Sequence, residues 1–210
     1  MDYAYDLNRY QKYVFDSDKK TTNQEMLAFD DVLLVPQYSK VESRSSVDLS
    51  QNLNSNIKLN IPIISSPMDT VTEIEMACAM ADLGGLGIIH RYNTSEVQAA
   101  MVHNVTMKGA PNAAAAIGVT GEFKERASEL VRAGANILCL DVAHGHHVLM
   151  ERALKTLKDI YGKDVHLMAG NVATLEGFND LADWGADSVR CGIGGGSICT
   201  TRIQTGHGVP

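Results

Sequence analysis

The feature that most constrains the fold of this chain is a regular alternation of short apolar runs with helical stretches, which begins near residue 61. The apolar runs are typical of strands and cover residues 61–65, 86–89, 113–119, 137–142, 165–169 and 188–193. The stretches between them have helical patterns and cover residues 73–83, 95–105, 122–133, 147–161 and 175–184. Strands and helices that alternate at a spacing of roughly 25 residues indicate βα units with parallel strands and right-handed crossovers.

Characteristic residues follow the ends of several predicted helices and strands. Gly134, Gly162 and Gly185 directly follow three of the helices, where each suits a left-handed helix end. Polar or glycine-rich segments follow the strands, at residues 65–68, His90, Asp141, Asn171 and 190–202. A closed βα barrel and an open doubly wound sheet both bind ligands at the carboxyl ends of their strands, so the alternation alone leaves both folds open.

Length and charge exclude some classes of partner. At 210 residues the chain can bury a substantial core in one domain. Its formal net charge of -7, from 18 basic and 25 acidic side chains, argues against a nucleic-acid or anionic-membrane surface. A nucleotide phosphate can still bind, because local loop dipoles decide that contact. No apolar run approaches the roughly 18 to 20 residues that span a bilayer, and no export signal opens the sequence, so we expect a cytoplasmic protein.

The four cysteines lack zinc-like pairing and should stay reduced in such a protein. Cys78, Cys139 and Cys191 lie in apolar runs, and we interpret them as small core residues. Cys199 differs because it follows the glycines of the run RCGIGGGSICTTR at residues 190–202 and is followed by two threonines. Glycine turns expose backbone dipoles that suit a phosphate or a cation, and a thiol held there suits a nucleophile. A surface loop with an incidental thiol is the alternative reading.

This run resembles the GxGxGSxCxTR-like active-site loop of the inosine 5′-monophosphate dehydrogenase and guanosine 5′-monophosphate reductase family. Further segments match that family in the same order. They are LAFDDVLLVP at 27–36, PIISSPMDTVTE at 62–73, GGLGIIH at 84–90, DVAHGH at 141–146 and MAGNVAT at 168–174.

The resemblance implies an α/β fold of the (β/α)8 TIM-barrel type, of which this chain has only about six βα units. We therefore expect residues 27–210 to form a catalytic barrel domain whose C-terminal part lies in a longer protein, with a genuine truncation as the alternative. Residues 1–26 read as an N-terminal extension. Residues 29–36 and 47–49 suit a small sheet that caps one end of the body.

Two features separate the members of the family, and they point in different directions. The chain has no room between residues 90 and 113 for the regulatory module that many dehydrogenases insert, and reductases lack that module. The run His144-Gly145-His146 and the tail at 202–210 look more like a dehydrogenase. The resemblance favours the dehydrogenase, the NADPH-dependent reductase is the alternative, and a non-catalytic nucleotide-binding βα scaffold is a third reading.

The dehydrogenase resemblance implies oxidation of inosine monophosphate to xanthosine monophosphate with NAD, through a covalent thioimidate on Cys199. Thr201 resembles the threonine that positions or activates the hydrolytic water. The implied substrate contacts are Ser66, Met68 and Ser197, and the implied NAD contacts are Asp141, Asn171, Arg190 and Gly192. The implied potassium ligands are the carbonyls of Gly194, Gly196 and Cys199. Relatives form homotetramers, and the principal candidates for the water-activating base lie beyond Pro210.

Structural roles remain open for some of these residues. Ser66 also suits a turn cap, Met68 a core position and Asp141 a hydrogen bond at the barrel rim. A zinc site at His144, His146 and His147 is less favoured, because Gly145 breaks the helix geometry that would bring His144 and His147 together.

Overall fold

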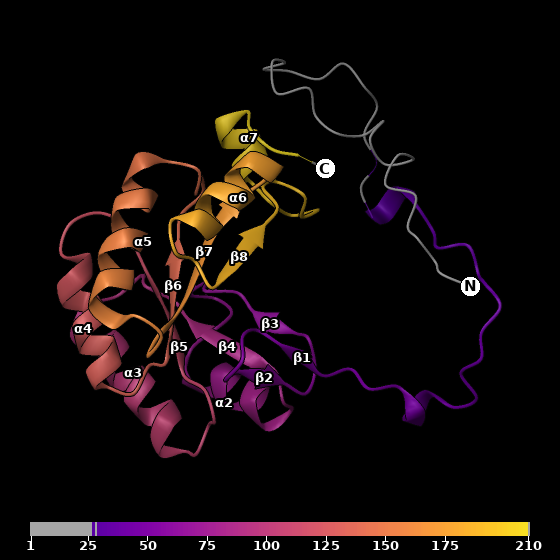
Figure 1. The fold of residues 1–210 in the computed structure, drawn as a ribbon, viewed down its shortest axis with the longest axis horizontal. Helices are drawn as coiled ribbons and strands as arrows, with labels where there is room; N and C mark the ends of the chain where they lie inside the picture. The colour runs from indigo at the N-terminus through magenta and orange to yellow at the C-terminus, as the bar shows by residue number, and fades with distance from the viewer. Residues whose placement is uncertain (1–26, 28, 210) are drawn as a thin grey trace.

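A parallel sheet flanked by helices forms the body of the chain in the computed structural model, which describes residue 27 and residues 29–209 (Figure 1). The strands of this sheet are β3 (Ile64–Ser65), β4 (Leu86–Ile89), β5 (Ala114–Ile117), β6 (Ile137–Asp141), β7 (His166–Val172) and β8 (Ser188–Cys191). Each strand pairs with the one that follows it in the chain, in the order β3-β4-β5-β6-β7-β8. A doubly wound sheet reverses its strand order at a switch point. The sequential order therefore identifies a partial TIM-type barrel and confirms the predicted fold class.

The helices connect successive strands and pack along one face of the sheet (Figure 1). They are α2 (Ile74–Asp82), α3 (Ser95–Met107), α4 (Phe123–Arg132), α5 (Val148–Tyr161) and α6 (Leu175–Asp183), followed by the short α7 (Thr201–Thr205). The hydroxyls of Thr94 and Thr174 accept backbone N–H groups and so begin α3 and α6. Gly134, Gly162 and Gly185 all have positive φ, which confirms the predicted helix ends. None of the described helices is long and apolar enough to cross a membrane.

Alternate side chains of each strand enter two separate cores. Ala115 and Ile117 of β5 pack toward the helices, whereas Ala114 and Ala116 enter the core on the opposite face. The same alternation holds along β6, where Leu138 faces the helices. Because both faces are covered, β4 and β5 are fully buried along their length, as parallel strands usually are.

A two-stranded antiparallel hairpin closes one side of the inner core. It consists of β1 (Gln51–Asn52) and β2 (Lys58–Leu59), and it contributes the buried side chains of Ile57 and Leu59. The turn forms because the Asn54 side-chain oxygen accepts the backbone N–H groups of Asn56 and Ile57, each at 2.8 Å.

The predicted capping sheet of residues 29–36 and 47–49 is wrong, because the only strands before β3 in the described chain are those of the hairpin. Residues 29–49 contain two short 3₁₀ turns, η2 (Phe29–Asp31) and η3 (Arg44–Ser46), and extend away from the body before the chain returns to it near β1 (Figure 1). Leu33 and Leu34 are 95% and 97% exposed, so this apolar segment has no strand or core to join in the described residues. The predicted extension at residues 1–26 lies outside the described residues.

The burial of the cysteines differs from the prediction at one position. Cys139 is buried and Cys78 is half-buried, but Cys191 is exposed, so its assignment to the core is wrong. Cys191 is the last residue of β8, the edge strand of the sheet, where covering elements end. Burial raises the pKa of the Cys139 thiol to about 12, which makes that thiol unreactive at neutral pH.

A buried histidine connects the hairpin to the sheet at the start of β7. The Asn54 amide donates to Nδ1 of His166 at 2.8 Å. Nε2 of the ring must then carry the proton, and it donates to the Ser188 hydroxyl at 2.8 Å. Burial lowers the pKa of His166, so the ring is neutral in the folded chain at pH 7.

We expect acidification to weaken this connection. Below about pH 6.5, the usual pKa of histidine, the unfolded chain binds a proton at His166 that the folded chain does not yet bind. The free energy of unfolding should therefore fall as the pH decreases through this range, until the lower folded pKa is passed. Urea unfolding from about pH 7.5 to about pH 5.5 measures the slope, which His166→Gln should flatten. The same substitution at the exposed His103 is the control. An unchanged slope in His166→Gln would contradict this account.

Candidate active site

The carboxyl ends of all six strands lie along one edge of the sheet, because the strands are parallel. The predicted site residues follow β3, β6, β7 and β8 at this edge. The structure brings them together in two groups. One group lies at the ends of β6, β7 and β8, and the other lies after β3.

A row of three residues in register forms the centre of the first group. Asp141 of β6 pairs with Gly170 of β7, and Gly170 pairs with Arg190 of β8. The Arg190 guanidinium reaches past Gly170 to Asp141, with 2.5 Å between Nη1 and Oδ1. A Cβ on Gly170 would lie 2.7 Å from the Cβ of Arg190. Glycine in the middle strand therefore permits the close approach of β8 that brings the carboxylate and the guanidinium together.

Asn171 is displaced from the regular ladder between β7 and β8. Gly170 pairs with Arg190 and Val172 pairs with Cys191, so Asn171 has no partner residue and forms a bulge. Its side-chain amide donates to the carbonyl oxygen of Gly192 at 2.9 Å. The predicted NAD contacts Asp141, Asn171, Arg190 and Gly192 thus lie at adjoining strand ends. This set combines a carboxylate acceptor with amide and guanidinium donors, which fits the ribose and amide groups of a dinucleotide.

The glycine–cysteine loop, residues 192–200, follows β8 and leads into α7. Gly194 has φ of 78°, a conformation that favours glycine, and a Cβ there would lie 3.2 Å from the Cβ of Arg202. Nη1 of Arg202 donates to the Gly194 carbonyl at 2.9 Å, so the helix that follows the loop also holds its first turn. The Val209 N–H donates to the Ile193 carbonyl at 2.9 Å and closes the segment.

Cys199 lies partly exposed at the end of this loop. Its backbone N–H donates to the Gly196 carbonyl at 3.0 Å. Hydrogen bonds from the Thr201 hydroxyl and from the Thr201 backbone lower the pKa of the Cys199 thiol, and the backbone and charge of Arg202 act in the same direction. A lower pKa gives more thiolate at neutral pH, and the thiolate is the nucleophilic form. In contrast, partial desolvation by the neighbouring residues raises the pKa of the Cys191 thiol, although the residue as a whole is exposed.

The predicted potassium ligands lie in the same loop. The Gly194 carbonyl accepts the Arg202 guanidinium, and the Gly196 carbonyl accepts the Cys199 N–H. A cation against the Gly194 oxygen would lie beside a guanidinium charge. Two of the three predicted carbonyls thus already accept a hydrogen bond within the chain, and potassium remains a prediction from the resemblance.

The predicted substrate contacts do not all meet. Ser197 is exposed in the glycine–cysteine loop, beyond β8. Ser66 is exposed and Met68 is 49% exposed, and both follow β3 at the other end of the strand order. Within the described residues, no hydrogen bond joins Ser66 or Met68 to the glycine–cysteine loop. Met68 is therefore not the core residue that its type alone suggests.

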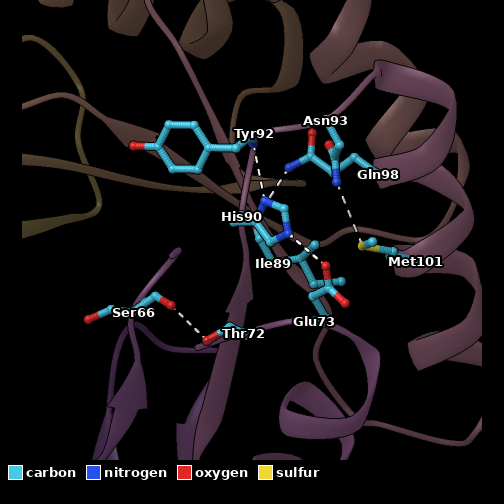
Figure 2. A network of polar contacts seen from close by, with 9 residues as sticks. All are labelled: Ser66, Thr72, Glu73, Ile89, His90, Tyr92, Asn93, Gln98 and Met101. Atoms are coloured by element: carbon cyan, nitrogen blue, oxygen red, sulfur yellow. Dashed lines mark hydrogen bonds and ion pairs between the residues drawn. The ribbon is translucent and has the colours of Figure 1, made fainter. Parts of the chain in front are cut away.

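Sequence reasoning missed the polar network behind Ser66 and Met68. It contains Thr72, Glu73 and His90, and Figure 2 shows the His90 ring between the backbone of Tyr92 and the carboxylate of Glu73. These residues come from β4 and from the segment between β3 and α2, which are neighbours only in the folded chain. The one available signal was that His90 and Thr72 both occur inside family-like segments.

The histidines after β6 take part in protein contacts. Nε2 of His146 lies 2.7 Å from Oδ2 of Asp180 on α6, and its ring lies 5.9 Å from the Trp184 ring. The backbone N–H of Gly145 donates to the Asn171 carbonyl at 2.7 Å. Across residues 27 and 29–209, no three His, Cys, Asp or Glu side chains gather as metal ligands would.

Comparisons with known proteins show which sequences this chain resembles. A family model described as "IMP dehydrogenase / GMP reductase domain" matches residues 26–210. The chain is 41% identical over 226 residues to inosine-5′-monophosphate dehydrogenase of Cryptosporidium parvum, with 88% of this chain and 55% of that protein covered. The corresponding enzyme of Borreliella burgdorferi is 38% identical, with coverage of 89% and 58%. That of Nitrosopumilus maritimus is 32% identical, with coverage of 89% and 65%. The chain thus spans 55% to 65% of the length of these relatives.

The lowered pKa of Cys199 predicts selective alkylation. At neutral pH, iodoacetamide should modify Cys199 faster than Cys191, although both side chains reach solvent. Thr201→Val should slow modification of Cys199 several-fold at neutral pH, because it removes the hydroxyl that stabilises the thiolate. Peptide mass mapping over time measures both rates. Thr205→Val is the matched control, since the Thr205 hydroxyl bonds to the Thr201 carbonyl. Faster modification of Cys191 than of Cys199 would contradict the assignment.

Proposed function

The chain belongs to the IMP dehydrogenase / GMP reductase family, and from that premise we propose that it oxidises inosine 5′-monophosphate to xanthosine 5′-monophosphate with NAD. We propose residues 27–210 as its catalytic domain. The observation that carries the proposal is the Cys199 thiol, whose pKa is lowered by Thr201 on a glycine-rich loop at the carboxyl edge of a parallel sheet. The relatives named above, each called a dehydrogenase, support this activity over the reductase.

In the proposed reaction the Cys199 thiolate adds to C2 of the purine and makes that carbon tetrahedral. Hydride then leaves C2 with its electron pair, and a thioimidate joins the purine to Cys199. Water adds to C2, and the C–S bond breaks with its electrons returning to sulfur. One proton of the water moves to the adjacent ring nitrogen of the purine and the other is released. Thr201, which already contacts the sulfur, is in a position to orient that water. Arg202 stabilises the thiolate before the first step and after the last.

NAD, when bound, supplies the acceptor for the hydride that leaves C2. Asp141 would accept hydrogen bonds from its ribose hydroxyls, and Arg190 holds that carboxylate in place. Asn171 and Gly192 would complete this side of the site, with their mutual hydrogen bond fixing the bulge. We propose that Ser66 and Met68 line the nucleotide pocket and that Ser197 contacts the phosphate.

The NADPH-dependent reductase is the second candidate, and one observation favours it. After β4 the chain proceeds directly through α3 to β5, without the inserted module that many dehydrogenases have. A cytoplasmic location and a homotetramer stay predictions from the sequence and the resemblance.

The test follows absorbance of the reduced nicotinamide with two substrate pairs. NADH should appear with inosine monophosphate plus NAD, and NADPH should not be consumed with guanosine monophosphate. Cys199→Ala should reduce turnover by at least about 1,000-fold, because it removes the nucleophile. Cys191→Ala, which removes the other exposed thiol, is the control.

The other outcomes identify the alternatives. Consumption of NADPH with guanosine monophosphate would identify the reductase. Unaltered turnover in Cys199→Ala would reject both catalytic readings. Nucleotide binding without either reaction would identify the scaffold.

A further inference from the structure

A partly buried polar cluster includes the proposed nucleotide contact Ser66 and holds the loop that also carries Met68. We call this cluster the clasp and define it as Ser66, Thr72, Glu73 and His90. Figure 2 shows these side chains between the end of β4 and the segment that joins β3 to α2. Thr72 is 0% exposed and His90 is 3% exposed, whereas Ser66 is exposed. The clasp therefore connects buried polar groups to an exposed loop.

The Thr72 hydroxyl closes the loop of residues 66–72. It donates to the Ser66 carbonyl at 2.7 Å, and it lies 2.8 Å from the Ser65 hydroxyl. The Thr72 backbone N–H donates to the Met68 carbonyl at 2.9 Å, and the Val71 N–H donates to the same oxygen at 3.0 Å. One buried side chain thus joins both ends of the loop that carries Ser66 and Met68.

His90 fixes Thr72 and Glu73 against the neighbouring strand. Its backbone N–H donates to the Thr72 carbonyl at 3.4 Å. The Tyr92 N–H donates to Nδ1 of the ring at 3.1 Å, so the proton of a neutral ring must lie on Nε2. Nε2 lies 3.1 Å from Oε1 of Glu73 and donates to it. Both ring nitrogens therefore have hydrogen-bond partners within the protein. The ring holds the loop and does not serve in proton transfer.

We propose that Thr72 is the positioning residue of the substrate site, which holds the loop of residues 66–72 in the shape that receives the purine mononucleotide. This inference rests on the proposed function. Thr72 reaches no reacting atom, and it acts through the Ser66 carbonyl. The proposed NAD contacts lie at the ends of β6 to β8, and β5 separates these strands from β4, next to which the clasp lies. Loss of the Thr72 hydroxyl should therefore weaken the binding of inosine monophosphate and leave the binding of NAD unchanged.

The experiment compares Thr72→Val, which keeps the side-chain shape, with Thr72→Ser, which keeps the hydroxyl. Calorimetry measures binding of inosine monophosphate and of NAD to each, and hydrogen exchange measures protection of the Met68, Val71 and Thr72 amides. Thr72→Val should weaken inosine monophosphate binding by roughly 5- to 10-fold and accelerate exchange of these amides by a similar factor, as expected for one lost buried hydrogen bond. Thr72→Ser should restore both properties.

Thr106→Val is the matched control. The Thr106 hydroxyl also donates to a backbone carbonyl, that of Val102 at 3.0 Å, but near the end of α3. Unchanged amide exchange in Thr72→Val would overturn the inference whether or not nucleotide binds. Equal weakening of inosine monophosphate and NAD would also overturn it, because it would indicate a general loss of structure. Failure of the unmodified chain to bind inosine monophosphate would contradict the proposed function instead. This outcome is measured on the unmodified chain, so it is distinguishable from the outcomes for Thr72→Val.

Discussion

The parallel, sequential order of the six strands is the constraint on which the rest of the structure depends. Because every strand runs in the same direction, each loop that follows a strand emerges at the same edge of the sheet. Segments separated by more than a hundred residues, such as Ser66 and Cys199, therefore belong to one edge. The helices and the hairpin bury the two faces of the sheet. Functional groups can therefore reach a ligand at the edge where the loops emerge.

Small residues and one irregularity shape that edge. Gly170 lets Arg190 approach Asp141, and the bulge at Asn171 turns an amide toward Gly192. The glycine–cysteine loop uses the same principle, since Gly194 admits the close approach of Arg202. Glycine at these positions is required for the backbone approach, and bulkier residues would separate the groups that the site combines.

The sequence predicted the strands and helices well because their signals are local. Each buried strand is a short apolar run, and each helix has a polar start or a glycine end, as at Thr94 and Gly134. The failures depend on distant partners. The capping sheet was wrong because apolar residues such as Leu33 have no partner strand among residues 29–209. Cys191 was wrong because β8 lies at an edge of the sheet that these residues form. The amino-acid composition shows neither the missing partner strand nor the edge position of β8.

The sequence predicted which residues belong to the site but not the contacts between them. The glycine–cysteine loop and Asp141 were identified as functional, yet the Asp141–Arg190 ion pair arises from the register of β6, β7 and β8. The clasp arises from contacts between the end of β4 and the segment that joins β3 to α2. The ion pair joins residues 49 positions apart, and the sequence alone does not show that they meet. The role of Thr72 becomes visible only when its hydroxyl is seen against the Ser66 carbonyl.

The central claim is that the Cys199 sulfur bonds to the purine during turnover. Acid quenching of the chain with inosine monophosphate and NAD, followed by peptide mass analysis, tests it most directly. The account predicts a purine mononucleotide adduct on the peptide that contains Cys199 and none on the peptide that contains Cys191. An adduct on another residue, or accumulation of xanthosine monophosphate with Cys199 unmodified throughout, would contradict it.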